Sequence, residues 1–542
     1  MSAWKGADTS YLQNIRHACR QHPSLKLLKA LPATPEHPSR IKILEFTSDT
    51  KINDVEIDKL PQLKSYWSNA PSSSTCQGRL YIVENISLPW ISALGSHFDI
   101  DPRFFAEYLK LDLDRTQNML AGYHTMRHLP SLRPTATFST FVYHEIRTFE
   151  GCAPRREEYQ ILTRDNIARL VTTVDHHSGR STGLIRRALG LWWKPSGPNE
   201  SWDAIILVDP GMSDMFHIRR WTAGESSPWQ TTSCQNTPYL DGYLDFSHWP
   251  PPKNQLSNAS DCVSYAHILG DISYYWHHAS PAEIQAALHD PREAFLFPYR
   301  ILASHWNLQL EYLVSVISNL EKGLLQFEQM DAHPQSEKIT AEVGALRVLL
   351  SDVNGWRRRA FFYLEQMRWN IENLNLPSTA GVSGDASSLC SGSTKDFRNH
   401  DDVSVKMARG IGTPTAASLA LTDLYPVLSS LRLSQERIQS LLPVVMGAFS
   451  LLEAQHSVIK ADLTIRLSSV GLVFVPLSFT ASVLSMGGDF LPGRRLFWVY
   501  WAVNMPLIVG LFWWAYWVQA GRMKRAGMRA WKETIGKGRD VD

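Results

Sequence analysis

The sequence predicts a mixed α/β domain, followed by a long stalk helix and two C-terminal transmembrane helices. Strand and helix patterns alternate over the first 210 residues without a strict βαβ rhythm. Near the C-terminus, the chain carries no charge for 22 residues after Arg466, and none for 26 residues between Arg495 and Arg522. At about 1.5 Å of helical rise per residue, either run spans a hydrocarbon core of about 30 Å.

The N-terminal part divides into two predicted regions. Residues 1–40 form a weakly ordered lead with one short helix, LQNIRHACR. Residues 41–275 form the mixed α/β domain, with an irregular Trp-, Pro- and Ser-rich insertion at about 212–275. Its strands are predicted at KILEF, LYIVEN, TFSTFVYHEIRTF and AIILVDP, and its helices at LPWISALGSHF and, after Asp101 and Pro102, FFAEYL.

The central part is predicted to be helical. Residues 276–376 form an antiparallel coiled-coil pair, which a Ser280–Glu283 capping box opens. In the first helix, apolar positions recur at alternating spacings of three and four: Leu310, Leu313, Ile317, Leu320, Leu324 and Phe327. The second helix repeats these spacings on either side of an eleven-residue interval: Leu346, Leu350 and Val353, then Leu364, Met367, Ile371 and Leu374. Residues 377–402 form a disordered Ser/Gly linker. Residues 403–466 form the stalk helix. Pro426, Pro443 and Pro476 are each expected to kink the helical path that leads into the first charge-free run, or to mark a break in it.

The charge-free runs are predicted to form a membrane hairpin. Residues 467–488 are the first transmembrane helix, 489–495 a loop, 496–521 the second helix and 522–542 a basic tail. So short a loop places both chain ends on one side of the lipid bilayer. The excess of Lys and Arg in the tail places that side in the cytosol, so the protein is predicted to be multi-pass with cytosolic N- and C-termini.

Composition excludes several classes of function. The 54 basic and 52 acidic residues nearly balance, so nothing indicates a nucleic-acid partner. The six cysteines have no paired spacing, which fits a reducing compartment and argues against a zinc ribbon or a disulfide framework. No nucleophile elbow, HExxH or Walker pattern occurs, so we expect no enzyme and no permanently bound cofactor.

Small residues line one face of the first predicted span. They define a polar stripe with spacings of three and four, consisting of Ser468, Gly471, Val475, Ser478, Ser482 and Ser485. Two interpretations stay open: the stripe is a tight helix-packing surface, or it lines a pore formed by several chains. A single hairpin cannot enclose a pore.

The end of the first span resembles the CorA/ZntB-type family of divalent-cation transporters, which carries a sequence like PLTFIAGIYGMNF there. Residues 475–479, VPLSF, align with its PLTF element without gaps, and Met486 and Phe490 follow nearby. Residues 78–109, GRLYIVENISLPWISALGSHFDIDPRFFAEYL, also resemble the family's N-terminal domain.

The resemblance implies a homopentamer with a pore lined by the polar stripe, and a divalent cation as transported or regulatory ion. One departure concerns the family's Gly-Met-Asn signature, which is degenerate here as Ser485-Met486-Gly487. Asp489 can supply carboxylate oxygens at the pore mouth, whereas Arg494 and Arg495 in the same loop repel cations. The residues do not assign metal ligands, so the ion stays open between the Mg²⁺ and Zn²⁺ classes.

Two functions are therefore consistent with the sequence. The first is a CorA-like channel or transporter for divalent cations. The second is a non-conducting membrane-anchored scaffold or sensor that keeps the same architecture. The missing Asn and the two loop arginines favour the second.

Overall fold

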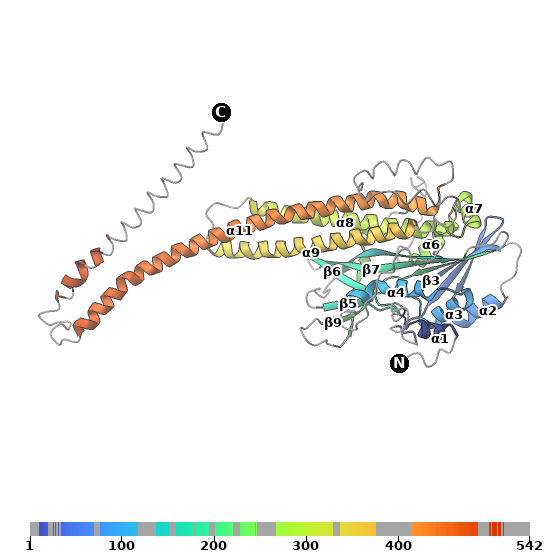
Figure 1. The fold of residues 1–542 in the computed structure, drawn as a ribbon, viewed down its shortest axis with the longest axis horizontal. Helices are drawn as coiled ribbons and strands as arrows, with labels where there is room; N and C mark the ends of the chain where they lie inside the picture. The colour runs from blue at the N-terminus through green and yellow to red at the C-terminus, as the bar shows by residue number, and fades with distance from the viewer. Residues whose placement is uncertain are drawn as a thin grey trace, which may run out of the picture. The chain divides into compact units, whose positions relative to one another are not determined.

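The computed structural model divides the chain into two compact units (Figure 1). The sheet unit comprises residues 1–321 and 353–440, and the helical unit comprises residues 322–352 and 441–542. The structure describes residues 10–19, 25, 28, 31, 34–69, 76–116, 137–150, 159–177, 180–194, 201–220, 228–243, 245, 267–328, 336–375, 414–485, 498–499, 501–506, 508–510 and 513.

The sheet unit is built on a mixed sheet of eleven strands. They are β1 (Arg40–Thr47), β2 (Ile52–Ile57), β3 (Cys76–Glu84), β4 (Phe138–Glu150), β5 (Tyr159–Thr163), β6 (Leu170–His177), β7 (Arg180–Trp193), β8 (Trp202–Val208), β9 (Met215–Arg220), β10 (Gln230–Ser233) and β11 (Asn236–Pro238). The main path runs β10-β9-β5-β6-β7-β8-β3-β1-β2, and β4 pairs with β7 and β11. Strands β3 and β8 run parallel, and the other described pairs are antiparallel. The mixed sheet predicted from the sequence is therefore present.

Strand β7 is the centre of this sheet. One of its edges pairs with β4 along its whole length, from Phe138 opposite Trp192 to Glu150 opposite Arg180. Its other edge pairs first with β6, up to Ile185, and then with β8, from Leu189 onwards. The ladder on this second edge is therefore interrupted between Ile185 and Leu189.

Four helices cover one face of the sheet: α1 (Ser10–Ala18), α2 (Leu60–Asn69), α3 (Leu88–Phe98) and α4 (Pro102–Thr116) (Figure 1). Proline opens α3, because its missing N–H is unneeded in the first turn. Asp99 in the left-handed conformation (φ 55°) ends it. The apolar sides of α1, α3 and α4 form one buried cluster with residues of β1, β3, β7 and β8.

The lead predicted to be weakly ordered contributes to this core, which corrects the sequence-based expectation for its described residues. Tyr11, Leu12, Ile15 and Cys19 are buried. The Tyr11 hydroxyl donates to the Ile100 carbonyl over 2.7 Å, and its ring lies where a Cβ at Gly95 would be. The short amphipathic α1 is ordered by α3, a contact that its own sequence does not reveal.

The insertion predicted to be irregular also contains regular structure. Its described residues form β9, β10 and β11, the 3₁₀ turn η3 (Tyr239–Asp241) and the start of α6 (Ile268–His277). Strands β10 and β11 are only four and three residues long and have a polar composition, QTTS and NTP. They form because β9 and β4 offer free edges, and their sequences carry no apolar alternation that would predict them.

Helices α7 (Pro281–His289), α8 (Leu296–Glu328), α9 (Ser336–Asn375) and α11 (Ala416–Ser485) follow, with the 3₁₀ turn η5 (Glu293–Phe295) before α8. The predicted capping box opens α7, since Ser280 and Glu283 exchange side-chain to main-chain hydrogen bonds. Helix α11 runs for 70 residues and continues through Pro426, Pro443 and Pro476, so the breaks expected at these prolines do not occur.

Helix α9 protects the free edge of β4 with amide side chains. Asn370, which is fully buried, accepts a hydrogen bond from the Val142 N–H (3.0 Å) and donates one to the Val142 carbonyl (2.7 Å). Asn373 donates to the Thr140 carbonyl, and the indole of Trp306 in α8 donates to the Val142 carbonyl. These side chains satisfy main-chain groups that a neighbouring strand would otherwise bind.

Several predicted segments lie outside the described residues. These are the linker at 377–402, the start of the stalk at 403–413, the loop at 489–495 and the tail at 522–542. The second predicted span is described at 498–499, 501–506, 508–510 and 513, all of them in helical conformation.

We expect Asn370→Leu to lower the free energy of unfolding by about 1–3 kcal/mol, because it leaves the buried Val142 N–H without an acceptor while nearly preserving volume. Thermal unfolding of the purified protein, followed by tryptophan fluorescence, measures this loss. Glu372→Gln on the exposed side of α9 is the matched control and should leave the unfolding temperature unchanged. Equal stability of Asn370→Leu and the parent chain would contradict the role of Asn370 at the strand edge.

Candidate functional site

The polar stripe predicted from the sequence lies on the last part of α11, in the helical unit. Ser468, Val475, Ser478 and Ser482 are exposed, and Gly471 is half-exposed. Among the described residues, no atom outside the local helix backbone lies within 4 Å of the position that a Cβ at Gly471 would occupy. Ser485 is the last residue of α11, whereas Met486, Gly487 and Asp489 lie outside the described residues. Most of the described part of the stripe therefore lies at the surface of the described residues.

A second periodic feature precedes the stripe on the same helix. Val444, Leu451, Val458 and Ile465 recur every seven residues, and each exposes between 46% and 67% of its surface. We call these four residues the heptad face. The polar stripe has the same period. Ser468 lies three positions after Ile465, and Val475 and Ser482 follow Ser468 at intervals of seven residues. The heptad face and the polar stripe thus share one register along α11.

One contact in the helical unit joins the two charge-free runs and was not predicted. The Thr480 hydroxyl of the first run donates to Oδ1 of Asn504 in the second, over 2.7 Å. Asn504 is fully buried. The sequence contains one indication of this contact, because Asn504 is one of only two side-chain amides in the charge-free run 496–521.

The described residues contain neither a membrane-length apolar helix nor a cluster of metal ligands. Among them, no helix has both the length and the apolar content needed to cross a membrane. No group of three or more His, Cys, Asp and Glu side chains in this part of the chain is placed to hold a metal ion.

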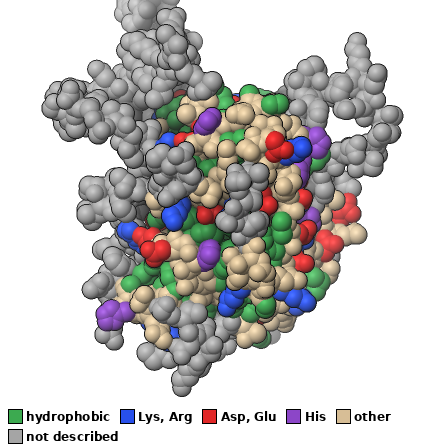
Figure 2. Space-filling view, turned by 90° about the vertical axis from the view of Figure 1, so that its right-hand side faces the viewer, with side chains coloured by type: hydrophobic (Ala, Val, Ile, Leu, Met, Phe, Trp, Pro, Cys, Tyr) green, Lys and Arg blue, Asp and Glu red, His purple; other side chains and the backbone are tan. Residues whose placement is uncertain are grey.

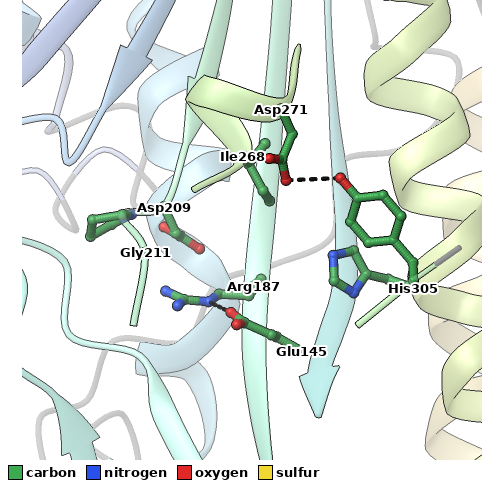
Figure 3. A pocket seen from close by; sticks show the side chains of 9 residues that line it. Glu145, Arg187, Asp209, Gly211, Ile268, Asp271 and His305 are labelled. Atoms are coloured by element: carbon green, nitrogen blue, oxygen red, sulfur yellow. Dashed lines mark hydrogen bonds and ion pairs between the residues drawn. The ribbon is translucent and has the colours of Figure 1, made fainter. Parts of the chain in front are cut away.

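The sheet unit contains a small charged cavity beside the interrupted edge of β7 (Figure 3). Its volume is about 20 Å³. It is lined by residues of β4, β7 and α8, by the chain after β8, and by the segment around α6: Glu145, Arg187, Asp209, Pro210, Gly211, Tyr243, Ile268, Asp271 and His305.

Asp209 closes the gap in the ladder. Its carboxylate accepts a hydrogen bond from the main-chain N–H of Ala188 (2.8 Å), a group of β7 that faces the gap. It also binds the Arg169 guanidinium through Nε (3.0 Å) and Nη2 (2.7 Å), and it accepts from the Tyr108 hydroxyl (2.8 Å). Arg169 and Asp209 are both almost completely buried, so each neutralises the charge of the other.

Glu145 joins two arginines on the same side of the sheet. Nε of Arg187 donates to one of its oxygens (2.8 Å), and Nε of Arg147 donates to the other (2.6 Å). Burial opposes ionisation of Glu145, but the two guanidinium groups outweigh burial and lower its pKa to about 2. Glu145 is therefore ionised at neutral pH and is shared between two cations.

The opposite wall of the cavity carries groups that are neutral or close to neutral. Asp271 accepts a hydrogen bond from the Tyr243 hydroxyl (2.8 Å), as Figure 3 shows. Burial raises the pKa of Asp271 to about 7; the Tyr243 hydrogen bond opposes this rise and the charge of Glu145 adds to it. His305 lies against the rings of Tyr143 and Tyr243, and burial lowers its pKa to about 4.

This charged cavity was missed by the sequence analysis. The signal was present in the strand TFSTFVYHEIRTF, where Tyr143, Glu145 and Arg147 alternate on one face. Their partners Arg187, Asp209 and Asp271 come from distant segments, and only the fold brings them together.

Comparisons with known proteins find little similarity. No protein-family model and no curated protein matches the chain. Among solved structures, the CorA magnesium transporter from Methanocaldococcus jannaschii is similar with a TM-score of 0.33 and 9% sequence identity, covering 87% of this chain and 96% of that chain. At this TM-score, the likeness does not establish a shared fold.

The raised pKa of Asp271 predicts a pH-dependent stability. Because the folded-state pKa is about 7 and the ordinary value is 3.8, the folded chain binds more protons between these values than the unfolded chain. Stability from neutral Asp271 is complete below about pH 4 and is lost as the pH rises through 7. Asp271→Asn stays neutral, so between pH 5 and 7 the parent chain should lose up to about 1.4 kcal/mol per pH unit relative to this variant.

Unfolding temperatures of both proteins between pH 5 and 8 measure this difference. Asp58→Asn makes the same change at an exposed position and serves as the control. The titration of Asp271 would be contradicted if the unfolding temperatures of Asp271→Asn and the parent chain differed by the same amount at every pH.

Proposed function

We propose that this chain is a CorA-like integral membrane protein that forms a homo-oligomer, a pentamer by the family resemblance, and conducts divalent cations of the Mg²⁺ or Zn²⁺ class. In the assembly, the α11 helices of several chains surround a common axis. The polar stripe faces this axis and lines the pore, with Asp489 at its mouth. No permanently bound cofactor is required, because the cation is the cargo or a regulatory ion.

The observation that carries this proposal is the shared register of the heptad face and the polar stripe. Exposed aliphatic side chains every seven residues are typical of a helix that packs against parallel copies of itself. Small residues lie three positions after Val444, Leu451 and Val458, and they are Gly447, Ala454 and Ala461. Helices can therefore approach closely along the same face. Further along this register, the small apolar residues give way to serines.

Serine hydroxyls suit the passage of a hydrated divalent cation. Mg²⁺ gives up its water reluctantly, so neutral oxygens that bind its hydration shell let it pass without complete dehydration. Ser468, Ser478 and Ser482 provide such oxygens, repeated around the axis by each chain.

We infer that the two charge-free runs form a hairpin in the lipid bilayer, with both chain ends in the cytosol. The hydrogen bond between Thr480 and Asn504 supports the hairpin, because buried polar side chains join transmembrane helices.

The second candidate is a non-conducting membrane-anchored scaffold or sensor with the same assembly. Ser485-Met486-Gly487 favours it, since no Asn amide stands at the end of the stripe to bind a hydrated ion. Arg494 and Arg495 also favour it, because several copies around an axis would place a ring of positive charge at the mouth.

Flux measurements separate the two candidates. Proteoliposomes containing the parent chain should take up Mg²⁺, Zn²⁺, Co²⁺ or Ni²⁺ faster than empty vesicles. Ser478→Leu should reduce this uptake at least tenfold, because a branched apolar side chain narrows and dries the pore in each chain. The off-stripe change Phe479→Leu is the matched control and should retain it. Uptake no faster than in empty vesicles excludes the transporter, and full uptake by Ser478→Leu returns the stripe to a packing role.

The heptad face predicts the contact between chains. Val458→Glu places a charge in that contact and should shift the purified protein in detergent to smaller particles, as mass photometry measures. Lys460→Glu, two residues away and exposed, should preserve the oligomer and is the matched control. An unchanged particle mass for Val458→Glu would place the contact on another face of α11.

A further inference from the structure

The charged cavity of the sheet unit is lined by an arginine whose two terminal nitrogens have no acceptor among the described residues. Arg187 exposes only 1% of its side chain, and its Nε is bound to Glu145. No described residue accepts a hydrogen bond from its Nη1 or Nη2. These two amino groups carry up to four N–H donors in a fixed fork. Leaving such donors without acceptors in a buried site is costly, so the cavity calls for an acceptor that the described protein groups do not supply.

We propose that this cavity binds one small monovalent anion, of the size of chloride, on Nη1 and Nη2 of Arg187. Its volume of about 20 Å³ limits the ligand. A cavity of about 10–15 Å³ is needed to hold one water molecule, so this one accepts a single ion of water-like size and excludes sulfate or an organic anion. The site lies within the sheet unit and is separate from the polar stripe of α11.

While Asp165 and Asp271 are protonated, the ion pairs around the cavity leave one positive charge uncompensated. Arg169 and Asp209 neutralise each other. Arg147 and Arg187 share the single carboxylate of Glu145, which gives two cations and one anion. An isolated buried charge costs several kcal/mol, and an anion beside the free end of Arg187 removes that cost.

The carboxylates that line the cavity do not repel such an anion strongly. Both oxygens of Glu145 accept hydrogen bonds from arginines, and both oxygens of Asp209 accept from Arg169, with further bonds from Tyr108 and the Ala188 N–H. These donors stabilise the negative charge of both carboxylates and so weaken their repulsion of an anion in the cavity. Asp271 on α6 is protonated below its raised pKa of about 7.

One further carboxyl competes with the anion. The charge of Asp165, between β5 and β6, interacts with Arg187; burial raises the pKa of Asp165 to about 6, and the Arg187 charge opposes this rise. When Asp165 is ionised, it compensates Arg187 and disfavours the anion. Binding is therefore linked to proton uptake and weakens as the pH rises. The titratable and charged groups of the surrounding elements are His37 before β1, Tyr108 on α4, Tyr143, Glu145 and Arg147 on β4, Arg187 on β7, Asp165 and Arg169 around β5 and β6, Asp209 after β8, Tyr243 and Asp271 around α6, and His305 on α8.

Equilibrium dialysis of the full-length protein in detergent against ³⁶Cl-labelled chloride tests this site. We expect saturable binding of about one chloride per chain at pH 6 and a weaker affinity at pH 8. The dissociation constant for chloride should rise by at most about tenfold per pH unit, which is the limit for one linked proton. Unlabelled bromide should displace the label at matched ionic strength, whereas gluconate should not.

Variants locate the ion on Arg187. Arg187→Gln should abolish chloride binding, and Arg187→Lys should weaken it at least tenfold, because lysine keeps the charge and loses the forked donors. Arg186→Gln, on the neighbouring residue of β7 that contacts Phe362, is the matched control and should bind chloride normally. Absence of saturable binding to the parent chain, or normal binding by Arg187→Lys, would overturn the site. If Arg187→Gln does not fold, the parent chain still tests the site. Displacement of chloride by gluconate, or an affinity for chloride that does not change between pH 6 and 8, would then overturn it.

Discussion

The buried pair of Arg169 and Asp209 is the interaction on which the sheet unit depends. A strand as long as β7 must have acceptors for its N–H groups along both edges, yet one edge is shared by two shorter strands that leave a gap between them. Asp209 fills this gap by accepting from Ala188 N–H, and Arg169 holds Asp209 in place. Removing either partner of such a pair costs about 3–5 kcal/mol, because it leaves a charge buried alone. The continuity of the eleven-stranded sheet is thus maintained by side chains where main-chain pairing stops.

The same solution recurs at the other interrupted edge of the sheet. The N-terminal half of β4 meets α8 and α9 in place of a strand, and the amides of Asn370 and Asn373 bind its main-chain groups there. Polar side chains thus complete the ladder at both places, and their burial is compensated by hydrogen bonds. The charged cavity is a consequence of this construction, since the residues that close the gap in β7 bring several ionisable groups together beside a strand end.

Helix α11 presents a different physical problem. Its first part is anchored in the sheet unit by buried aliphatic residues such as Leu424, Leu431 and Ile438. In the helical unit, the heptad face of the same helix exposes large aliphatic side chains along a regular line. Exposed apolar surface of this extent is unfavourable in water, so a helix with this pattern is expected to be covered by another chain or by lipid. The proposed assembly around α11 and the proposed membrane hairpin remove this unfavourable exposure together.

Local patterns in the sequence determined the main elements of the protein. Several elements follow from residues near one another in sequence. They are strands rich in β-branched and aromatic residues such as KILEF and LYIVEN, the proline-opened helices, the Ser280–Glu283 capping box and the long helix leading into a charge-free run. The polar stripe likewise follows from helical spacing alone, because a helix fixes which side chains share a face.

Tertiary structure alone decided the rest. The burial of α1, the short polar strands β10 and β11, the amide caps of β4 and the charged cavity depend on pairs separated by up to 234 residues, such as Ser139 and Asn373. A polar residue in a strand has the same local signature whether it faces water or a buried partner. Arg187 and Asp209 therefore acquire their roles only where the fold removes water from around them, because burial is what makes an ion pair, a missing acceptor or a raised pKa matter.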